Sequence, residues 1–80
     1  MMPQLLIIES GHGTPSEESK PGTDKFIYCL EGEAELKISG SSYILKKGAS
    51  TYFDASLSHG IKNTGAKTAK LLTVTSPAAL

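Results

Sequence analysis

The stretch KFIYCLEGEAELKIS, residues 25–39, predicts two consecutive β-strands joined by a sharp turn. Residues 25–31 are rich in β-prone and aromatic side chains on both faces of a strand. In residues 33–39, Ala34, Leu36 and Ile38 alternate with Glu and Lys, which is typical of a strand with one buried face. Gly32 separates the two segments and permits the turn.

The same reasoning predicts further strands on both sides of this stretch. They are expected at residues 4–9, 43–45, 51–53, 57–62 and 68–76, and Pro77 is expected to end the last of them. Residues 10–24 are rich in Gly, Pro, Ser, Thr and charge and indicate a loop, and turns are predicted at 40–42, 47–48 and 63–65. The sequence therefore predicts an all-β sandwich or barrel of about seven strands without a helix. No repeat or linker divides it, so we expect one domain over residues 1–80 with its barrel at about 4–76.

Composition excludes several classes of partner. Eight Lys balance eight acidic residues, so no basic surface for nucleic acid or an anionic membrane is expected on this domain. The single Cys29 lies in an apolar run, which predicts a buried, reduced thiol. No signal peptide and no apolar run of about 18 residues is found, so a soluble cytoplasmic protein is predicted. A chain of this length buries only about 60% of its unfolded surface, which favours association with a partner.

Two blocks of the sequence have the spacing of the two motifs of a known family. The first runs from Gly13 through Ser19-Lys20-Pro21 and Lys25 to Gly32, and the second from Gly48 through Asp54-Ala55-Ser56 and His59 to Asn63. In this spacing the sequence resembles the cupin superfamily. Residues 26–36 also resemble the cupin domain that follows a helix-turn-helix in bacterial transcriptional regulators. The resemblance implies a cupin-type jelly-roll barrel of antiparallel strands.

The resemblance also implies where a metal would be held, and this sequence departs from the family there. Family metalloenzymes use two His and a Glu of the first block and one His of the second, and the corresponding positions here are Ser19, Pro21, Lys25 and His59. Only His59 keeps a ligand type, and an ammonium repels a divalent cation. We therefore predict no metal cofactor. The alternative is a divalent transition metal held by His59 and His12 of the loop, with Glu17, Glu18 or Asp24 available only if the loop folds inward.

Strand parity predicts a cavity lined by one face of the barrel. Lys25, Ile27 and Cys29 share a face, His59 and Ile61 share another, and Tyr52 is a further candidate. His59 is either a packed, hydrogen-bonded core residue or a contact to a small molecule. Lys25 either reaches solvent or supplies fixed charge, and with His59 it would bind an anionic ligand such as a carboxylate or phosphate.

Three classes of function stay open at this stage. The apolar opposite face of the first quoted strand, with Phe26, Tyr28 and Leu30, needs cover either from within the chain or from a second subunit, and a homodimer is expected. The sequence favours a non-catalytic, ligand-sensing or dimerising module of a transcriptional regulator. The alternatives are a small cupin enzyme of dioxygenase or isomerase type that uses His59, and a structural assembly module. No catalytic residue is predicted, because no second acid or base is placed beside His59.

Overall fold

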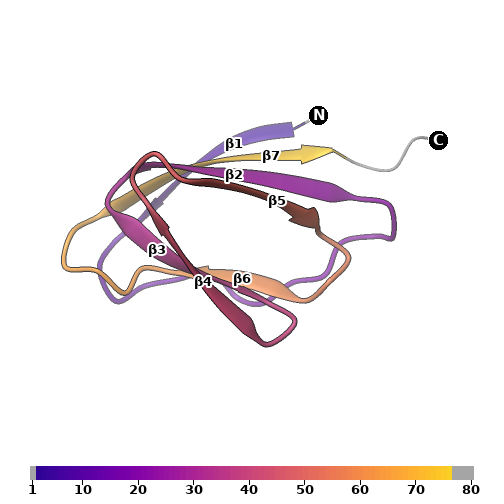
Figure 1. Ribbon diagram of the computed structural model, residues 1–80, viewed down its shortest axis with the longest axis horizontal. Coiled ribbons are helices and arrows are strands. Elements are labelled where there is room, and N and C mark those ends of the chain that lie inside the picture. Colours follow the sequence, from indigo (N-terminus) through magenta and orange to yellow (C-terminus); the bar gives the residue numbers. More distant parts are fainter. Residues whose placement is uncertain (1, 77–80) are drawn as a thin grey trace.

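The computed structural model describes residues 2–76, and these residues form seven strands and no helix (Figure 1). The prediction of an all-β fold of about seven antiparallel strands is confirmed. Pro77, which is expected to end the last strand, lies outside the described residues. The strands are β1 (Met2–Ile8), β2 (Asp24–Glu31), β3 (Glu33–Ile38), β4 (Ser41–Lys46), β5 (Ser50–Asp54), β6 (His59–Lys62) and β7 (Ala69–Ser76).

The strands form two sheets that face each other (Figure 1). The larger sheet has the order β1-β7-β2-β5 and the smaller one β4-β3-β6, and every pair is antiparallel. Neighbours in the sheets are often distant in sequence, as with β1 and β7, which is the jelly-roll arrangement. In the part of the chain described, no helix is long and apolar enough to cross a membrane.

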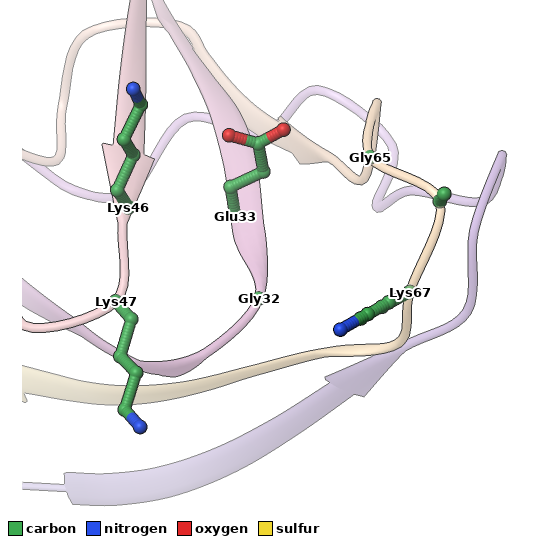
Figure 2. A pocket seen from close by; sticks show the side chains of 7 residues that line it. Gly32, Glu33, Lys46, Lys47, Gly65 and Lys67 are labelled. Atoms are coloured by element: carbon green, nitrogen blue, oxygen red, sulfur yellow. The ribbon is translucent and has the colours of Figure 1, made fainter.

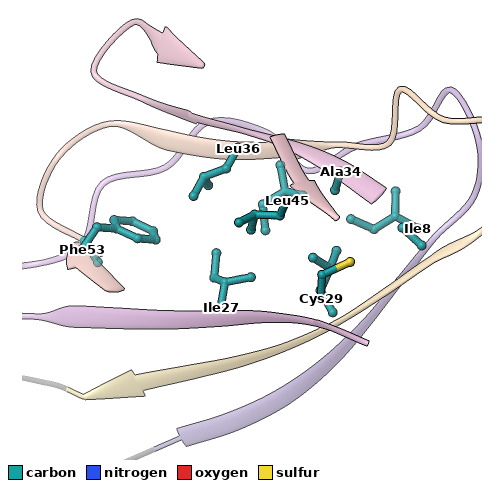
Figure 3. Packing of buried hydrophobic residues seen from close by; sticks show 11 residues of the cluster. Ile8, Ile27, Cys29, Ala34, Leu36, Leu45 and Phe53 are labelled. Carbon is teal, nitrogen blue, oxygen red and sulfur yellow. The ribbon is translucent and has the colours of Figure 1, made fainter. Parts of the chain in front are cut away.

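The hydrophobic core lies between the two sheets (Figure 3). Alternate residues of β2, β3 and β7 point inward, because side chains of a strand alternate between its faces. Ile27, Leu36, Leu71 and Cys29 are fully buried. The thiol of Cys29 is buried as predicted, and its burial raises its pKa above the ordinary value.

Residues 9–23 pair with a strand through their backbone, although their composition predicted a loop. They run antiparallel to β6 as an irregular edge, with bridges between Gly13 and Lys62 and between Glu17 and His59. Gly13 permits the approach, because a Cβ at this position would lie 2.7 Å from the carbonyl oxygen of Ile61. Gly, Pro and Ser signal a loop in isolation, but here the free edge of β6 supplies hydrogen bonds to the segment.

The predicted turn at residues 40–42 is shifted by one residue. Ile38 pairs directly with Ser41, so the turn consists of Ser39 and Gly40. Both have positive φ, at 47° and 84°, as a two-residue hairpin turn of type I′ requires. This turn matches the twist of the flanking strands, which explains why the strand resumes already at Ser41.

Asn63, the last residue of the second motif, anchors the segment after β6. Its side chain is fully buried, and Nδ2 donates to the carbonyl oxygens of Ile8 (2.8 Å) and Lys67 (2.7 Å). Its Oδ1 accepts from the backbone N–H of Gly65 (2.9 Å). One amide therefore connects the end of β1 to the turn between β6 and β7.

Candidate functional site

His59 lies at the start of β6, between the two sheets, with only 3% of its surface exposed. Its ring contacts Phe53 edge to face, with the ring centroids 5.1 Å apart. A cavity of about 200 Å³ opens beside the imidazole. It is lined by Gln4, Leu6, Thr14, Pro15, Glu17, Lys25, His59, Ile61 and Thr73.

The partners of the two ring nitrogens assign the protonation of His59. Nδ1 lies 2.8 Å from the carbonyl oxygen of Leu57, which can only accept, so Nδ1 carries the proton. Nε2 lies 3.1 Å from Nζ of Lys25, whose ammonium can only donate, so Nε2 accepts. The imidazole is therefore neutral, and both of its nitrogens are engaged within the protein.

Lys25 turns inward instead of reaching solvent. Its Nζ donates to Oε1 of Glu17 at 2.9 Å as well as to His59, and its side chain is only 13% exposed. The same Oε1 lies 3.3 Å from Nε2 of His59, so the ammonium bridges two acceptors that are close to each other. Glu17, Lys25 and His59 together form what we call the lysine cluster.

Glu17 is the member of the cluster that sequence reasoning did not single out. The sequence predicts it only as a loop carboxylate that reaches the site if the loop folds inward, and its backbone pairing with His59 is what brings it there. The hydrogen bond from Lys25 lowers the pKa of the Glu17 carboxyl below its ordinary value, although desolvation acts in the opposite direction. Its side chain remains 60% exposed, so the Glu17 carboxylate forms the outer edge of the cluster.

The other predicted site residues are divided between three places. Ile61 lines the cavity together with His59 and Lys25. Ile27 and Cys29 share the inward face but are fully buried in the core and do not line the cavity. Tyr52 lies on the outer face of the larger sheet, because it pairs with the outward-facing Phe26. Its side chain is 66% exposed, and its hydroxyl donates to Asp24. His12 is exposed in the segment before the first motif.

The donor set does not fit a divalent metal ion. Nε2 of His59 and Oε1 of Glu17 would be the two ligands, and the ammonium of Lys25 lies within hydrogen-bond distance of both. It occupies the lone pairs that a metal would use and repels a cation. Among residues 2–76, no group of three or more His, Cys, Asp and Glu side chains is placed to hold a metal ion. Ser19 and Pro21 do not line the cavity.

A second cavity, of about 470 Å³, lies at the opposite end of β3 (Figure 2). Figure 2 shows Lys67 extending into it, while Lys46 and Lys47 point in opposite directions from each other. Glu33 is the single acidic side chain in its lining, which Gly32, Gly65 and Ala66 complete. No ion pair within the described residues holds these lysines in place. The sequence did not predict this cavity, because Lys46 and Lys47 at the end of β4 are far in sequence from Lys67 in the turn before β7.

Comparison with protein families identifies the fold independently. The model of the Cupin domain family (Cupin_2) matches residues 4–75, which is almost the entire chain. This chain belongs to the cupin family. Comparison with curated proteins finds no match.

Three solved structures illustrate the range of proteins that share this cupin fold. TT1209 from Thermus thermophilus is 31% identical, with a TM-score of 0.83 over 94% of this chain and 70% of that one. The Cupin_2 domain of an XRE family transcriptional regulator from Enterobacter cloacae has a TM-score of 0.92 at 18% identity, over 96% of this chain and 81% of that one. A predicted oxalate decarboxylase from Thermotoga maritima has a TM-score of 0.84 at 24% identity, over 92% and 64%. The last two likenesses show the fold alone.

Proposed function

We propose that this cupin domain is a non-catalytic module that binds a small molecule in the cavity beside His59. The observation that carries the proposal is the lysine cluster, in which a largely buried ammonium and a neutral imidazole face one small cavity. At about 200 Å³ the cavity is below the range of roughly 300–1,000 Å³ that drug-sized ligands occupy. A ligand of a few non-hydrogen atoms is therefore expected.

The geometry favours binding over catalysis. A general base needs a lone pair free to take a proton from the reacting molecule. Nδ1 of His59 donates to the Leu57 carbonyl and Nε2 accepts from Lys25, so neither nitrogen is free for that role. The enzyme alternative, of dioxygenase or isomerase type, would require this hydrogen bonding to be broken first.

The first experiment measures metal uptake and ligand binding in the same samples. Purified protein and the His59→Ala variant are incubated with Fe(II), Mn(II), Ni(II) and Zn(II), and bound metal is counted after desalting. We expect neither to retain metal, and we expect small molecules that raise the melting temperature of the wild type to lose this effect in His59→Ala. One equivalent of metal retained by the wild type and lost in the variant would contradict the proposal. His12→Ala is the matched control, because His12 is exposed and away from the cavity.

A second observation supports a dimerising role. The outer face of the larger sheet carries two rows of uncharged residues across its strands, Pro3, Val74, Phe26 and Tyr52 in one and Leu5, Leu72, Tyr28 and Ser50 in the other. Leu5 is 54% exposed and Ile7, beyond the second row, 60%. An apolar groove over Phe26, Tyr52 and Val74 lies on the same face. This uncharged face is what we call the outer face.

We propose that a second copy of the chain covers the outer face. Asp24 and Asp54 lie at one end of it, and Lys70 lies near the other, where it pairs with Glu31 at 3.7 Å. A two-fold axis that lies in the plane of the face, perpendicular to the strands, would place Asp24 and Asp54 of one copy near Lys70 of its partner. From strand spacing and rise, the face measures roughly 450 Å² per copy, so a dimer would bury on the order of 900 Å². That area is typical of weak association.

Sedimentation over a range of protein concentrations tests the dimer. We expect a concentration-dependent shift from monomer to dimer in the wild type, and monomer alone in Val74→Lys, because a charge in the centre of the face would be buried without a partner. Thr64→Lys adds the same charge in an exposed turn outside the outer face and is expected to leave the dimer unchanged. A wild type that stays monomeric at millimolar concentration would refute the dimer but not the proposal of ligand binding.

Ligand binding and dimerisation together are the properties of a regulatory module. The fold is shared with the cupin domain of a transcriptional regulator, and this agrees with the proposal, although a shared fold assigns no function by itself. A helix-turn-helix encoded in frame directly upstream would support this assignment. An unlinked gene beside metabolic enzymes would favour the enzyme alternative instead.

A further inference from the structure

Lys25 places a cation where the family would place a metal ligand. Its ammonium is hydrogen-bonded to Nε2 of His59 and to Oε1 of Glu17, at 3.1 and 2.9 Å. The two acceptors are only 3.3 Å apart, so the three atoms form a compact triangle and the ammonium contacts both acceptors at once. His59 and Lys25 are nearly or largely buried, whereas Glu17 is mostly exposed. His59 and Lys25 are therefore held in place, and the Glu17 carboxylate is the member of the cluster that another group can replace.

We propose that the ammonium of Lys25 binds the carboxylate of a small organic acid, and that the Glu17 carboxylate occupies the place of this ligand carboxylate in the free protein. The ligand carboxylate displaces that of Glu17 and takes over the hydrogen bond from Nζ of Lys25. The inference rests on the proposed function, since it names the ligand class of the same cavity.

The need of Lys25 for an anion follows from its burial. The Lys25 side chain is only 13% exposed, so little water can reach its ammonium, and His59 offers it one acceptor but no compensating charge. Glu17 provides the compensating charge in the free protein. Its displacement therefore requires another anion, and a neutral molecule would leave the ammonium uncompensated.

The cavity favours a carboxylate over a phosphate. It has one cation, and the Thr14 hydroxyl beside it is already bonded to the backbone of Ile61. A single ammonium balances a monoanion, whereas phosphate dianions are bound by several charged donors or by a guanidinium fork. The volume corresponds to about seven water molecules, which suits a short organic acid. Leu6, Pro15 and Ile61 in the lining would contact its apolar part.

The experiment titrates sodium acetate and sodium propionate into ¹⁵N-labelled protein at constant ionic strength and follows amide shifts. Four variants are compared with the wild type: Glu17→Gln, Lys25→Met, Lys25→Arg and Glu18→Gln. Because an exposed ion pair contributes little, we expect Glu17→Gln to bind the acids about two- to fivefold more tightly than the wild type. Lys25→Met should bind them at least about tenfold more weakly and Lys25→Arg should retain binding, since a charged hydrogen bond is lost only in the first. Glu18→Gln is the matched control, because it removes the neighbouring negative charge from outside the cavity.

The outcomes separate the parts of the proposal. Equal affinity in the wild type and Glu17→Gln, with weaker binding in Lys25→Met, would refute the role of Glu17 and leave Lys25 as the cation. Acid binding that is unchanged in Lys25→Met, or shifts centred on Gly32 and Gly65 of the second cavity, would refute the Lys25 site. Tighter binding of inorganic phosphate than of propionate would refute the carboxylate class. The underlying binding function fails by a different result, namely no His59-dependent stabilisation by any compound in the thermal screen.

Discussion

Replacement of Asn63 by Ala should destabilise the domain severely, although the residue contacts no ligand. The change removes two donations to the carbonyl oxygens of Ile8 and Lys67 and one acceptance from the N–H of Gly65. A hydrogen bond contributes about 0.5–1.5 kcal/mol net, so the three together amount to about 3 kcal/mol. A chain of 80 residues has a total stability of roughly 4–12 kcal/mol. The variant would therefore lose a quarter or more of it.

Thermal and urea unfolding followed by far-UV circular dichroism measure this loss. For a domain of this size, about 3 kcal/mol corresponds to a fall in melting temperature of about 12–24 °C. Thr64→Ala is the matched control, because Thr64 is exposed and adjacent, and we expect it to change stability by no more than about 0.5 kcal/mol. Both are measured at one low protein concentration, so that association does not contribute. A loss below about 1 kcal/mol in Asn63→Ala would refute the conclusion that this amide connects β1 to the turn after β6.

Three further predictions concern the edge segment and the lysine cluster. Gly13→Ala should cost about 1–3 kcal/mol in urea unfolding, because its Cβ would lie 2.7 Å from the Ile61 carbonyl oxygen; an unchanged midpoint would mean that the segment is not held against β6. Lys25→Glu should bind Mn(II) or Zn(II) in equilibrium dialysis where the wild type does not, because the variant has a carboxylate in place of the ammonium beside Glu17 and His59. If the variant gains no metal, Lys25 is not the residue that excludes metal from the wild type. The pKa of Glu17 is lower in the folded protein than in the unfolded chain. Its contribution to stability is therefore present above the unfolded pKa and is lost as the pH falls through the folded pKa. Melting temperatures of the wild type and Glu17→Gln, measured from pH 7 to pH 3, should converge below about pH 4.5. The difference at pH 7 should stay below about 1 kcal/mol, because the pair is partly exposed, and parallel curves throughout would contradict this account.

Much of the site could be located from sequence, but its chemistry could not. Parity along the strands correctly placed Lys25 and His59 on inward faces, and the resemblance to the family implied that both stand at positions of one metal site. Parity does not report how deep a residue lies, so Ile27 and Cys29 were expected in the cavity but form the core beneath it. The sequence predicts Tyr52 at the cavity, because nothing in it reports the register of β5 against β2. Its pairing with Phe26 places it outside.

The sequence by itself determined the all-β class, the order of the strands along the chain and the membership of the cupin family, since these depend on local alternation, turn residues and motif spacing. Through the resemblance to the family, it also implied that the metal ligands are replaced at three of four positions. Only the tertiary structure decided that Lys25 turns inward, that His59 is neutral and doubly bonded, and that Glu17 completes their cluster. The physical reason is that Glu17 reaches the cluster through backbone pairing of an irregular segment with the edge of β6, and no local pattern of side chains encodes that contact.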